Sequence, residues 1–204
     1  MGSGHSGSTL LELILSSHSQ MFGLGELFKL KEIIDQPYQD TPNICSICES
    51  ACTYWNDRAS FPVLRHYFSN KHFYSPLIRM LHRYRKSIYD YFFEWFGYNN
   101  LIDSSKNVNW IRRQLQPAYN CGNFTPVLVY ITRDGRAVVN SVRRKYPHRG
   151  VKQISQNWKR NVKQMNSYFQ DFPADHRVKV AYEQLATRPE TVTTPSPTER
   201  IRPT

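Results

Sequence analysis

An unbroken run of apolar and β-branched residues at 127–132 constrains the fold of this 204-residue chain more than any other segment. Such a run is typical of a strand that is covered on both faces of a parallel sheet. An Arg-Asp-Gly turn at 133–135 ends it, and helices are predicted over 136–144 and 151–169. A second short strand is predicted over 178–182. This alternation of strand, turn and helix predicts an α/β fold with a parallel sheet.

The part of the chain before this strand is predicted to be mostly helical. Apolar spacing indicates helices over 9–17, 26–34 and 108–116. Residues 61–96 are also helical in pattern, with aromatic side chains recurring every three to four positions, and this stripe is expected to be core. Residues 100–102 are expected to end another strand.

The charge of the chain favours an anionic partner. Lys and Arg number 27 against 16 Asp and Glu, a formal net charge of +11. Nucleic acid, anionic lipid, an acidic polysaccharide and a polyphosphate cofactor all fit this charge. No run approaches the roughly 18 apolar residues of a membrane span, and no secretory signal is recognised at the start. A soluble cytoplasmic protein is expected, with a lost N-terminal anchor as the alternative.

A Gly/Ser-rich loop at 2–9 runs directly into the first predicted helix. Small residues allow backbone amides to turn toward an anion, and the helix N-terminus adds unpaired N–H groups. Ser8 stands where a nucleoside triphosphatase carries its lysine, which argues against ATP or GTP hydrolysis. The alternative is a loop that only caps a core helix. The candidate anion-binding residues are Gly4, His5, Ser6, Gly7, Ser8 and Thr9.

A second candidate anion site follows the clearest strand. Arg133 is at its carboxyl end, where ligands of open α/β sheets bind. The arginine fork suits a phosphate because it makes two hydrogen bonds at once. Ser141 and Lys145 follow on one face of the next helix, and this second site is expected to be separate from the loop. The alternative is a solvated basic helix.

The order of these motifs resembles the sulfotransferases that use 3′-phosphoadenosine 5′-phosphosulfate (PAPS). Residues 5–9 resemble their 5′-phosphosulfate loop, and residues 133–141 match their R-D-x-R-x4-S segment for the 3′-phosphate. Residues 24–26 are similar to the G-E that follows the loop helix in relatives. Residues 103–106 resemble the D-S-S-K of bacterial members, and residues 182–186 their Y-E-x-L element.

The resemblance implies a three-layer, P-loop nucleotide-hydrolase-like α/β domain, incomplete, over residues 1–190, with a parallel sheet flanked by helices. It implies that PAPS donates a sulfonyl group to an acceptor hydroxyl or amine, with no metal. The acceptor is open among carbohydrate, peptide, lipid and small metabolite, and residues 36–96 are expected to form an acceptor-side helical insertion. Compared with the family pattern the chain is expected to be truncated at both ends, and residues 191–204 to form a disordered tail.

The resemblance also implies roles for individual residues. Glu26 is the candidate base for the acceptor proton, and Lys106 the candidate group that stabilises the sulfonate or leaving oxygen. Tyr182 is expected on the nucleotide side of the site. His5 stands where relatives carry Lys or Arg and is assigned to catalysis as well as binding. The alternatives are a helix-start carboxylate for Glu26, a surface lysine for Lys106 and a buried strand tyrosine for Tyr182.

Two further interpretations compete with sulfonyl transfer. One is a basic nucleic-acid-binding module, using the charge and the helix around residues 79–85; the other is a nucleotide kinase with a degenerate phosphate loop. Neither has a recognised motif beyond the features above, so no nucleic-acid partner is expected. Cys45, Cys48 and Cys52 lie in an irregular stretch at 36–62 and could supply three zinc ligands, although free thiols or one local disulfide are favoured.

Overall fold

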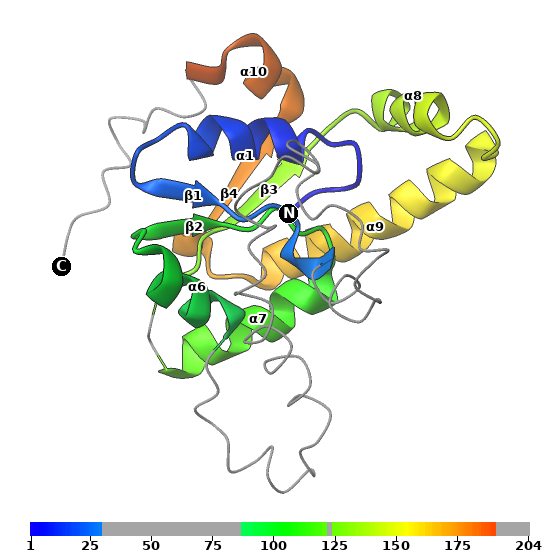
Figure 1. Cartoon of the computed structure of the whole chain (residues 1–204). Helices are drawn as coiled ribbons and strands as arrows, with labels where there is room; N and C mark the ends of the chain where they lie inside the picture. Colours follow the sequence, from blue (N-terminus) through cyan, green and yellow to red (C-terminus); the bar gives the residue numbers. More distant parts are fainter. Residues whose placement is uncertain (30–86, 122–123, 191–204) are drawn as a thin grey trace, which may run out of the picture. The chain divides into compact units, whose positions relative to one another are not determined.

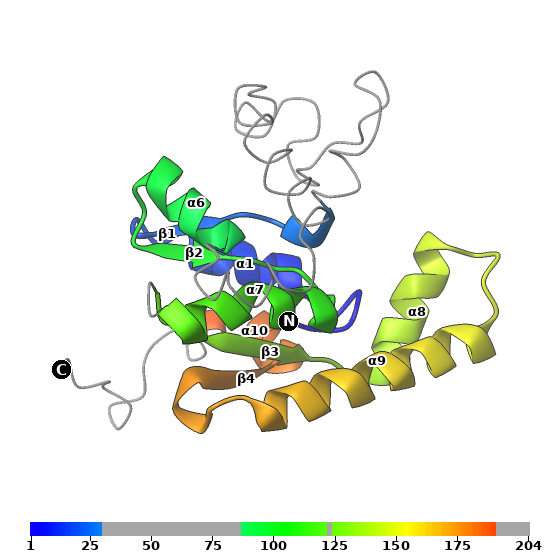
Figure 2. The same cartoon turned by 90° about the horizontal axis from the view of Figure 1, so that it is seen from below.

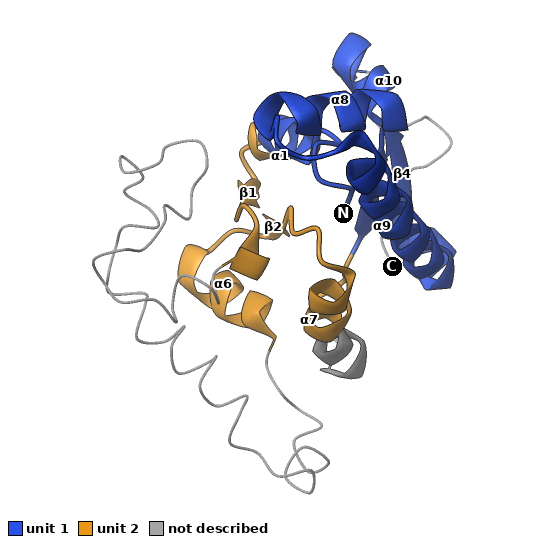
Figure 3. Ribbon diagram, turned by 90° about the vertical axis from the view of Figure 1, so that its right-hand side faces the viewer, with its two compact units in different colours: residues 1–15, 127–204 blue, residues 16–126 orange. Residues whose placement is uncertain are grey.

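The computed structural model describes residues 1–29, 87–121 and 124–190, and for 116–121 the backbone alone. The cysteine cluster, the tail at 191–204 and most of the stretch at 61–96 lie outside the described residues. The chain divides into two compact units, Met1–Leu15 with Val127–Thr204, and Ser16–Pro126 (Figure 3). We call them unit 1 and unit 2 and describe each by itself.

Unit 1 is built on two parallel strands with helices that follow them along the chain (Figure 1). Strands β3 and β4 pair in register from Leu128 opposite Arg177 to Thr132 opposite Ala181. Leu11, Ile131, Val180 and Leu185 form its buried core cluster. The elements are α1 (Ser8–Ser16), β3 (Leu128–Thr132), α8 (Gly135–Lys145), α9 (Val151–Asp171), η4 (Ala174–His176), β4 (Arg177–Ala181) and α10 (Tyr182–Thr187).

The first residues of the chain lie along β3. Gly2 forms a parallel bridge with Ile131, and the Ile131 amide donates to the Met1 carbonyl at 2.9 Å. The Met1 nitrogen donates to the Val129 carbonyl. Residues 1–3 therefore lie beside the carboxyl-terminal part of β3 and lead directly into the Gly/Ser loop. In open α/β sheets a phosphate-binding strand is followed by its loop in the same way.

Helices α8 and α9 form a hairpin that follows β3 (Figure 2). Asp134 caps α8 by accepting from the Arg136 amide at 2.7 Å. Hydrogen bonds from Arg136 hold the pKa of the Asp134 carboxyl at about 2, below its ordinary 3.8, so this cap stabilises α8 above about pH 4 and is lost as the pH falls through about 2. Gly135 is required because a Cβ there would lie 2.5 Å from the Trp158 ring of α9.

Unit 2 holds a second parallel pair, in which β1 lies beside β2 with Phe22 opposite Leu101. Its α6 begins with a capping box in which the Ser87 side chain accepts from the Asp90 amide and Asp90 accepts from the Ser87 amide. Phe92 of this helix is fully buried and stacks on Phe96, 5.4 Å between ring centroids. The elements are β1 (Met21–Gly23), η1 (Leu27–Lys29), α6 (Ile88–Phe96), β2 (Asn100–Ile102) and α7 (Val108–Cys121).

The α/β class with parallel strands is confirmed. Three local predictions differ from the structure. Residues 21–23 lie between the helices predicted at 9–17 and 26–34, where no strand was predicted, and they form β1 by pairing with β2. The predicted helix at 26–34 is a 3₁₀ turn over its described part, Leu27–Lys29. The last strand ends at Ala181, one residue early, because Tyr182 begins α10.

Candidate functional site

The Gly/Ser loop of unit 1 makes a tight turn before α1. His5 takes a φ of 64° and Gly7 a φ of 93°, which is the left-handed region in which a non-glycine residue is uncommon. The Ser6 amide donates to the Ser3 carbonyl at 3.1 Å, closing the turn. The Ser6 hydroxyl is buried and has no hydrogen-bond partner among the described residues. A buried hydroxyl of this kind fits a loop that takes a ligand.

Arg133 extends from the end of β3 to this loop. Its guanidinium donates to the His5 carbonyl at 3.0 Å and lies 4.0 Å from the centre of the Tyr182 ring. The Arg133 Nε is buried, and the described residues offer it no partner. The guanidinium is therefore held on one side by the loop backbone and on another by an aromatic face, with donor capacity left over for an anion.

Ser141 joins the same group of residues. Its hydroxyl lies 3.0 Å from His5 Nδ1, so the second turn of α8 contacts the loop. Arg133 and Ser141, the residues expected to form a second anion site, therefore both hydrogen-bond to His5 of the loop. Residues 1–3 lie alongside β3, so the loop that comes after them lies at the carboxyl end of that strand. Arg133 and the start of α8 lie at the same end.

Tyr182 packs directly against the loop. A Cβ on Gly7 would lie 2.2 Å from Tyr182 Cδ2, so only glycine fits at this position. The ring thus contacts Gly7 as well as Arg133. Tyr182 lies directly after the last residue of β4, Ala181. The sequence led us to expect Tyr182 on the nucleotide side of the site and did not predict its contacts with Gly7 and Arg133.

The remaining loop and helix candidates differ in exposure. Ser8 is buried at the start of α1, whereas Thr9 is exposed and Gly4 partly exposed. Lys145 is exposed in the last turn of α8, with its Nζ 5.7 Å from the centre of the Tyr146 ring. Within the described part of the chain, no hydrogen bond or ion pair joins Lys145 to the loop, so the structure does not bring it to His5 and Arg133 as it does Ser141.

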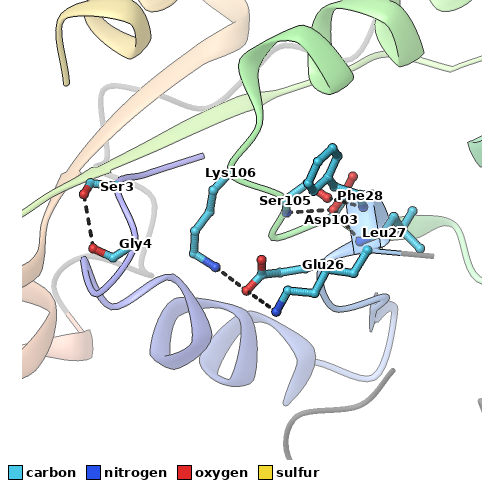
Figure 4. A network of polar contacts seen from close by, with 9 residues as sticks. Ser3, Gly4, Glu26, Leu27, Phe28, Asp103, Ser105 and Lys106 are labelled. Atoms are coloured by element: carbon cyan, nitrogen blue, oxygen red, sulfur yellow. Dashed lines mark hydrogen bonds and ion pairs between the residues drawn. The ribbon is translucent and has the colours of Figure 1, made fainter. Parts of the chain in front are cut away.

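Unit 2 contains the other pair of candidates. Lys106 Nζ lies 2.5 Å from Glu26 Oε1, and Lys29 Nζ lies 3.4 Å from the same oxygen (Figure 4). The side chains of Lys106 and Glu26 are 21% and 26% exposed, so the ion pair remains accessible to a ligand. The pair brings together a base and a cation, the two groups that a transfer to a hydroxyl or amine requires.

A hydrogen-bonded clamp holds this ion pair in place. The Ser104 amide donates to the Gly25 carbonyl at 2.9 Å, and the Phe28 amide donates to Ser105 Oγ at 2.9 Å. These bonds join the segment 25–28 to the segment 103–106, one bond on each side of Glu26 along the chain and both just before Lys106. Figure 4 shows the end of the clamp at Phe28 and Ser105. The backbones that carry Glu26 and Lys106 are therefore fixed to each other independently of the ion pair.

Asp103 is the centre of this clamp. One carboxylate oxygen accepts from the Ser105 amide at 2.8 Å and the Leu27 amide at 3.4 Å. The other accepts from Tyr89 Oη at 2.7 Å and Trp110 Nε1 at 3.4 Å. Asp103 was predicted only as part of the segment 103–106, and its role as the acceptor of four hydrogen bonds was not predicted. The available signal was a carboxylate directly after a predicted strand and before two serines.

We expect Asp103→Asn to lower the free energy of unfolding by about 1–3 kcal/mol, because an amide leaves one or more buried donors without an acceptor. Urea unfolding followed by circular dichroism measures this, with Asp175→Asn as the control. The Asp175 side chain is 80% exposed, and its ion pair among the described residues is with His176, at 3.5 Å. Equal stability of the two variants would contradict the role of Asp103 in holding the two segments together.

A model of the sulfotransferase family matches residues 1–195. The chain belongs to the sulfotransferase family. This confirms the family resemblance and the expected reaction class, sulfonyl transfer, and supports a P-loop-like fold for the sulfotransferase. A search of curated proteins found no match.

The described residues of this sulfotransferase contain neither a membrane-spanning helix nor a cluster of metal-ligating side chains. No helix there has both the length and the apolar composition needed to cross a bilayer. No group of three His, Cys, Asp or Glu side chains there is placed to hold a metal ion, while the cysteines at 45, 48 and 52 lie outside that part of the chain.

Proposed function

We propose that this protein is a PAPS-dependent sulfotransferase that acts on an acceptor hydroxyl or amine. Two buried polar atoms that have no partner among the described residues carry the proposal: Ser6 Oγ in the loop before α1, and Arg133 Nε directly after β3. Buried polar groups are normally hydrogen-bonded, so these two donors are expected to bind a ligand. A ligand that carries phosphate supplies the acceptor oxygens that both donors need.

The residues of unit 1 fit a nucleotide with phosphates at two positions. The loop amides and the hydroxyls of Ser6, Ser8 and Thr9 would hold the 5′-phosphosulfate, at the positive end of α1. Arg133 and Ser141 would hold the 3′-phosphate, with Lys145 adding charge from the last turn of α8.

In the proposed mechanism, bound PAPS would supply an activated sulfonyl group to the acceptor, and adenosine 3′,5′-bisphosphate would leave as the second product. Glu26 accepts the proton of the acceptor hydroxyl or amine. Lys106 donates a hydrogen bond to an oxygen on which negative charge develops. Their ion pair keeps both side chains oriented before substrate binds, which lowers the cost of assembling them.

His5 gives the proposed reaction a pH dependence. An imidazole has an ordinary pKa of about 6.5 and bound phosphosulfate favours its charged form, so we expect the rate to fall as the pH rises through the His5 pKa. Turnover measured between about pH 6 and 8 checks this. His5→Lys should remove the fall, because lysine stays charged over that range. A flat profile together with full activity of His5→Ala would remove His5 from the mechanism.

Thermal shift with three ligands tests the proposal. Adenosine 3′,5′-bisphosphate should stabilise the protein by an amount that rises with the logarithm of its concentration above the Kd, whereas ATP and a short duplex DNA should not stabilise it. Stabilisation by ATP alone would favour a degenerate kinase, and stabilisation by DNA alone a nucleic-acid-binding module. The absence of any shift with the bisphosphate would refute donor binding by this protein.

A further inference from the structure

Two short segments lie side by side where the β3–β4 pair ends. The strands are parallel, and Thr132 opposite Ala181 is the last pair of their register. The next two residues on each chain, 133–134 and 182–183, are therefore brought next to each other as the chains leave the sheet. Three of these four side chains bind within the candidate site or cap α8, and Glu183 is the fourth.

Glu183 binds the backbone that joins β3 to α8. Its Oε1 accepts a hydrogen bond from the Asp134 amide at 3.0 Å. That amide belongs to the peptide group between Arg133 and Asp134. Because a peptide group is planar, a partner that holds its N–H also limits rotation of the backbone on both sides of the group. Glu183 therefore restrains the backbone immediately after Arg133.

The side chain of Arg133 is held at its other end by the neighbour of Glu183. The centre of the Tyr182 ring lies 4.0 Å from the guanidinium, which also donates to the His5 carbonyl at 3.0 Å. The start of α10 thus supplies a carboxylate for the backbone beside Arg133 and an aromatic face for its guanidinium. A guanidinium binds phosphate best through two parallel hydrogen bonds, so its orientation determines how well it binds.

The same peptide group also leads into α8. Asp134 caps this helix by accepting from the Arg136 amide at 2.7 Å. Ser141 belongs to the second turn of the helix, and its hydroxyl lies 3.0 Å from His5 Nδ1. A rotation of the peptide after Arg133 would therefore change the direction of Arg133 and the position of Ser141 together.

We propose that Glu183 is a positioning residue, which holds the peptide after Arg133 so that Arg133 and Ser141 both meet the 3′-phosphate of the donor; this role rests on the proposed function. Glu183 acts through the hydrogen bond that it accepts. Its charge alone would have the opposite effect, because a carboxylate near a phosphate site repels the anion. Removal of the carboxylate should therefore weaken nucleotide binding if Glu183 positions the peptide, and tighten it if only the charge acts.

A carboxylate that stabilises the start of α10 is the alternative role for Glu183. The residue lies in the first turn of this helix, where a negative charge is favourable. Glutamine cannot replace that charge, but its amide oxygen can accept the hydrogen bond from the Asp134 amide. The variant Glu183→Gln therefore separates the two roles.

Calorimetric titration of the whole protein with adenosine 3′,5′-bisphosphate and with adenosine 5′-phosphate tests the role. Glu183→Ala should bind the bisphosphate about 5–20-fold more weakly and the 5′-phosphate within about 3-fold of the wild type. Glu183→Gln should stay within about 3-fold for both nucleotides. The control, Asp175→Ala, removes a carboxylate that is 80% exposed in the turn before β4, and should also stay within about 3-fold. Urea unfolding shows that each variant is folded at the temperature of the titration.

Four results would overturn this role: a bisphosphate preference that Glu183→Ala retains, tighter binding of the bisphosphate by Glu183→Ala, equal weakening of both nucleotides, or a Glu183→Gln variant that binds as weakly as Glu183→Ala. The first of these would leave the proposed function in place, since the wild type would still prefer the bisphosphate. No preference for the bisphosphate in the wild type would reject the proposed 3′-phosphate site and the role of Glu183 with it.

Discussion

Glu26→Gln is expected to lower sulfonyl transfer about 10²–10⁴-fold, the usual contribution of a general base. Glutamine keeps the shape and can still accept a hydrogen bond from Lys106, which lies 2.5 Å away in the wild type, but it cannot take up a proton. Turnover is measured with ³⁵S-labelled PAPS on an acceptor that the wild-type protein modifies. Binding of adenosine 3′,5′-bisphosphate should be unchanged, because that ligand is assigned to residues of unit 1.

The control for this loss is Lys29→Ala. Lys29 lies 3.4 Å from the same Glu26 oxygen but is 48% exposed, and an exposed pair of this kind contributes little. We expect its turnover to stay within about 3-fold of the wild type. Full activity of Glu26→Gln, or an equal loss in Lys29→Ala, would exclude Glu26 as the base.

Gly7→Ala is expected to destabilise the protein by at least about 3 kcal/mol and to abolish the bisphosphate shift. Its φ of 93° is costly for any residue with a Cβ, and that Cβ would lie 2.2 Å from the Tyr182 ring. Gly4→Ala in the same loop is the matched control, because nothing lies within 4 Å of a Cβ there. Urea unfolding of the two variants measures the difference.

The double variant Gly7→Ala with Tyr182→Ala separates the two causes of the stability loss expected in Gly7→Ala, which are backbone strain and the clash with the ring. Removal of the ring relieves the clash but leaves the backbone strain, so the double variant should be more stable than the sum of the two single losses predicts. Additive losses of stability would show that the Gly7–Tyr182 contact does not determine the conformation of the loop.

Elements with strong local signals were predictable from the sequence. The apolar run before Arg133 and the capping Asp134 mark the end of β3 and the start of α8, and both lie within one residue of their predicted bounds. The strand β1 was not predictable, because three residues form it only by pairing with a partner far along the chain. Local composition carries no information about that pairing.

The candidate site, like the fold, was predictable from the sequence only in part. The identity of His5, Arg133 and Ser141 as candidates followed from motif spacing, but the hydrogen bond between His5 and Ser141 spans 136 positions and appears only in the fold. The role of Asp103 was missed for a similar reason. Its four hydrogen-bond donors come from separate segments, so no local pattern reveals the clamp.

The central claim is that unit 1 recognises a nucleotide through a 3′-phosphate as well as its 5′ end. Calorimetric titration with adenosine 3′,5′-bisphosphate and with adenosine 5′-phosphate tests it most directly. The wild type should bind the bisphosphate about 10–100-fold more tightly, the usual gain from hydrogen bonds to a charged group. Arg133→Ala should lose this preference, and Arg143→Ala, an exposed arginine of α8, should keep it. Equal affinity of the wild type for the two nucleotides would contradict the account.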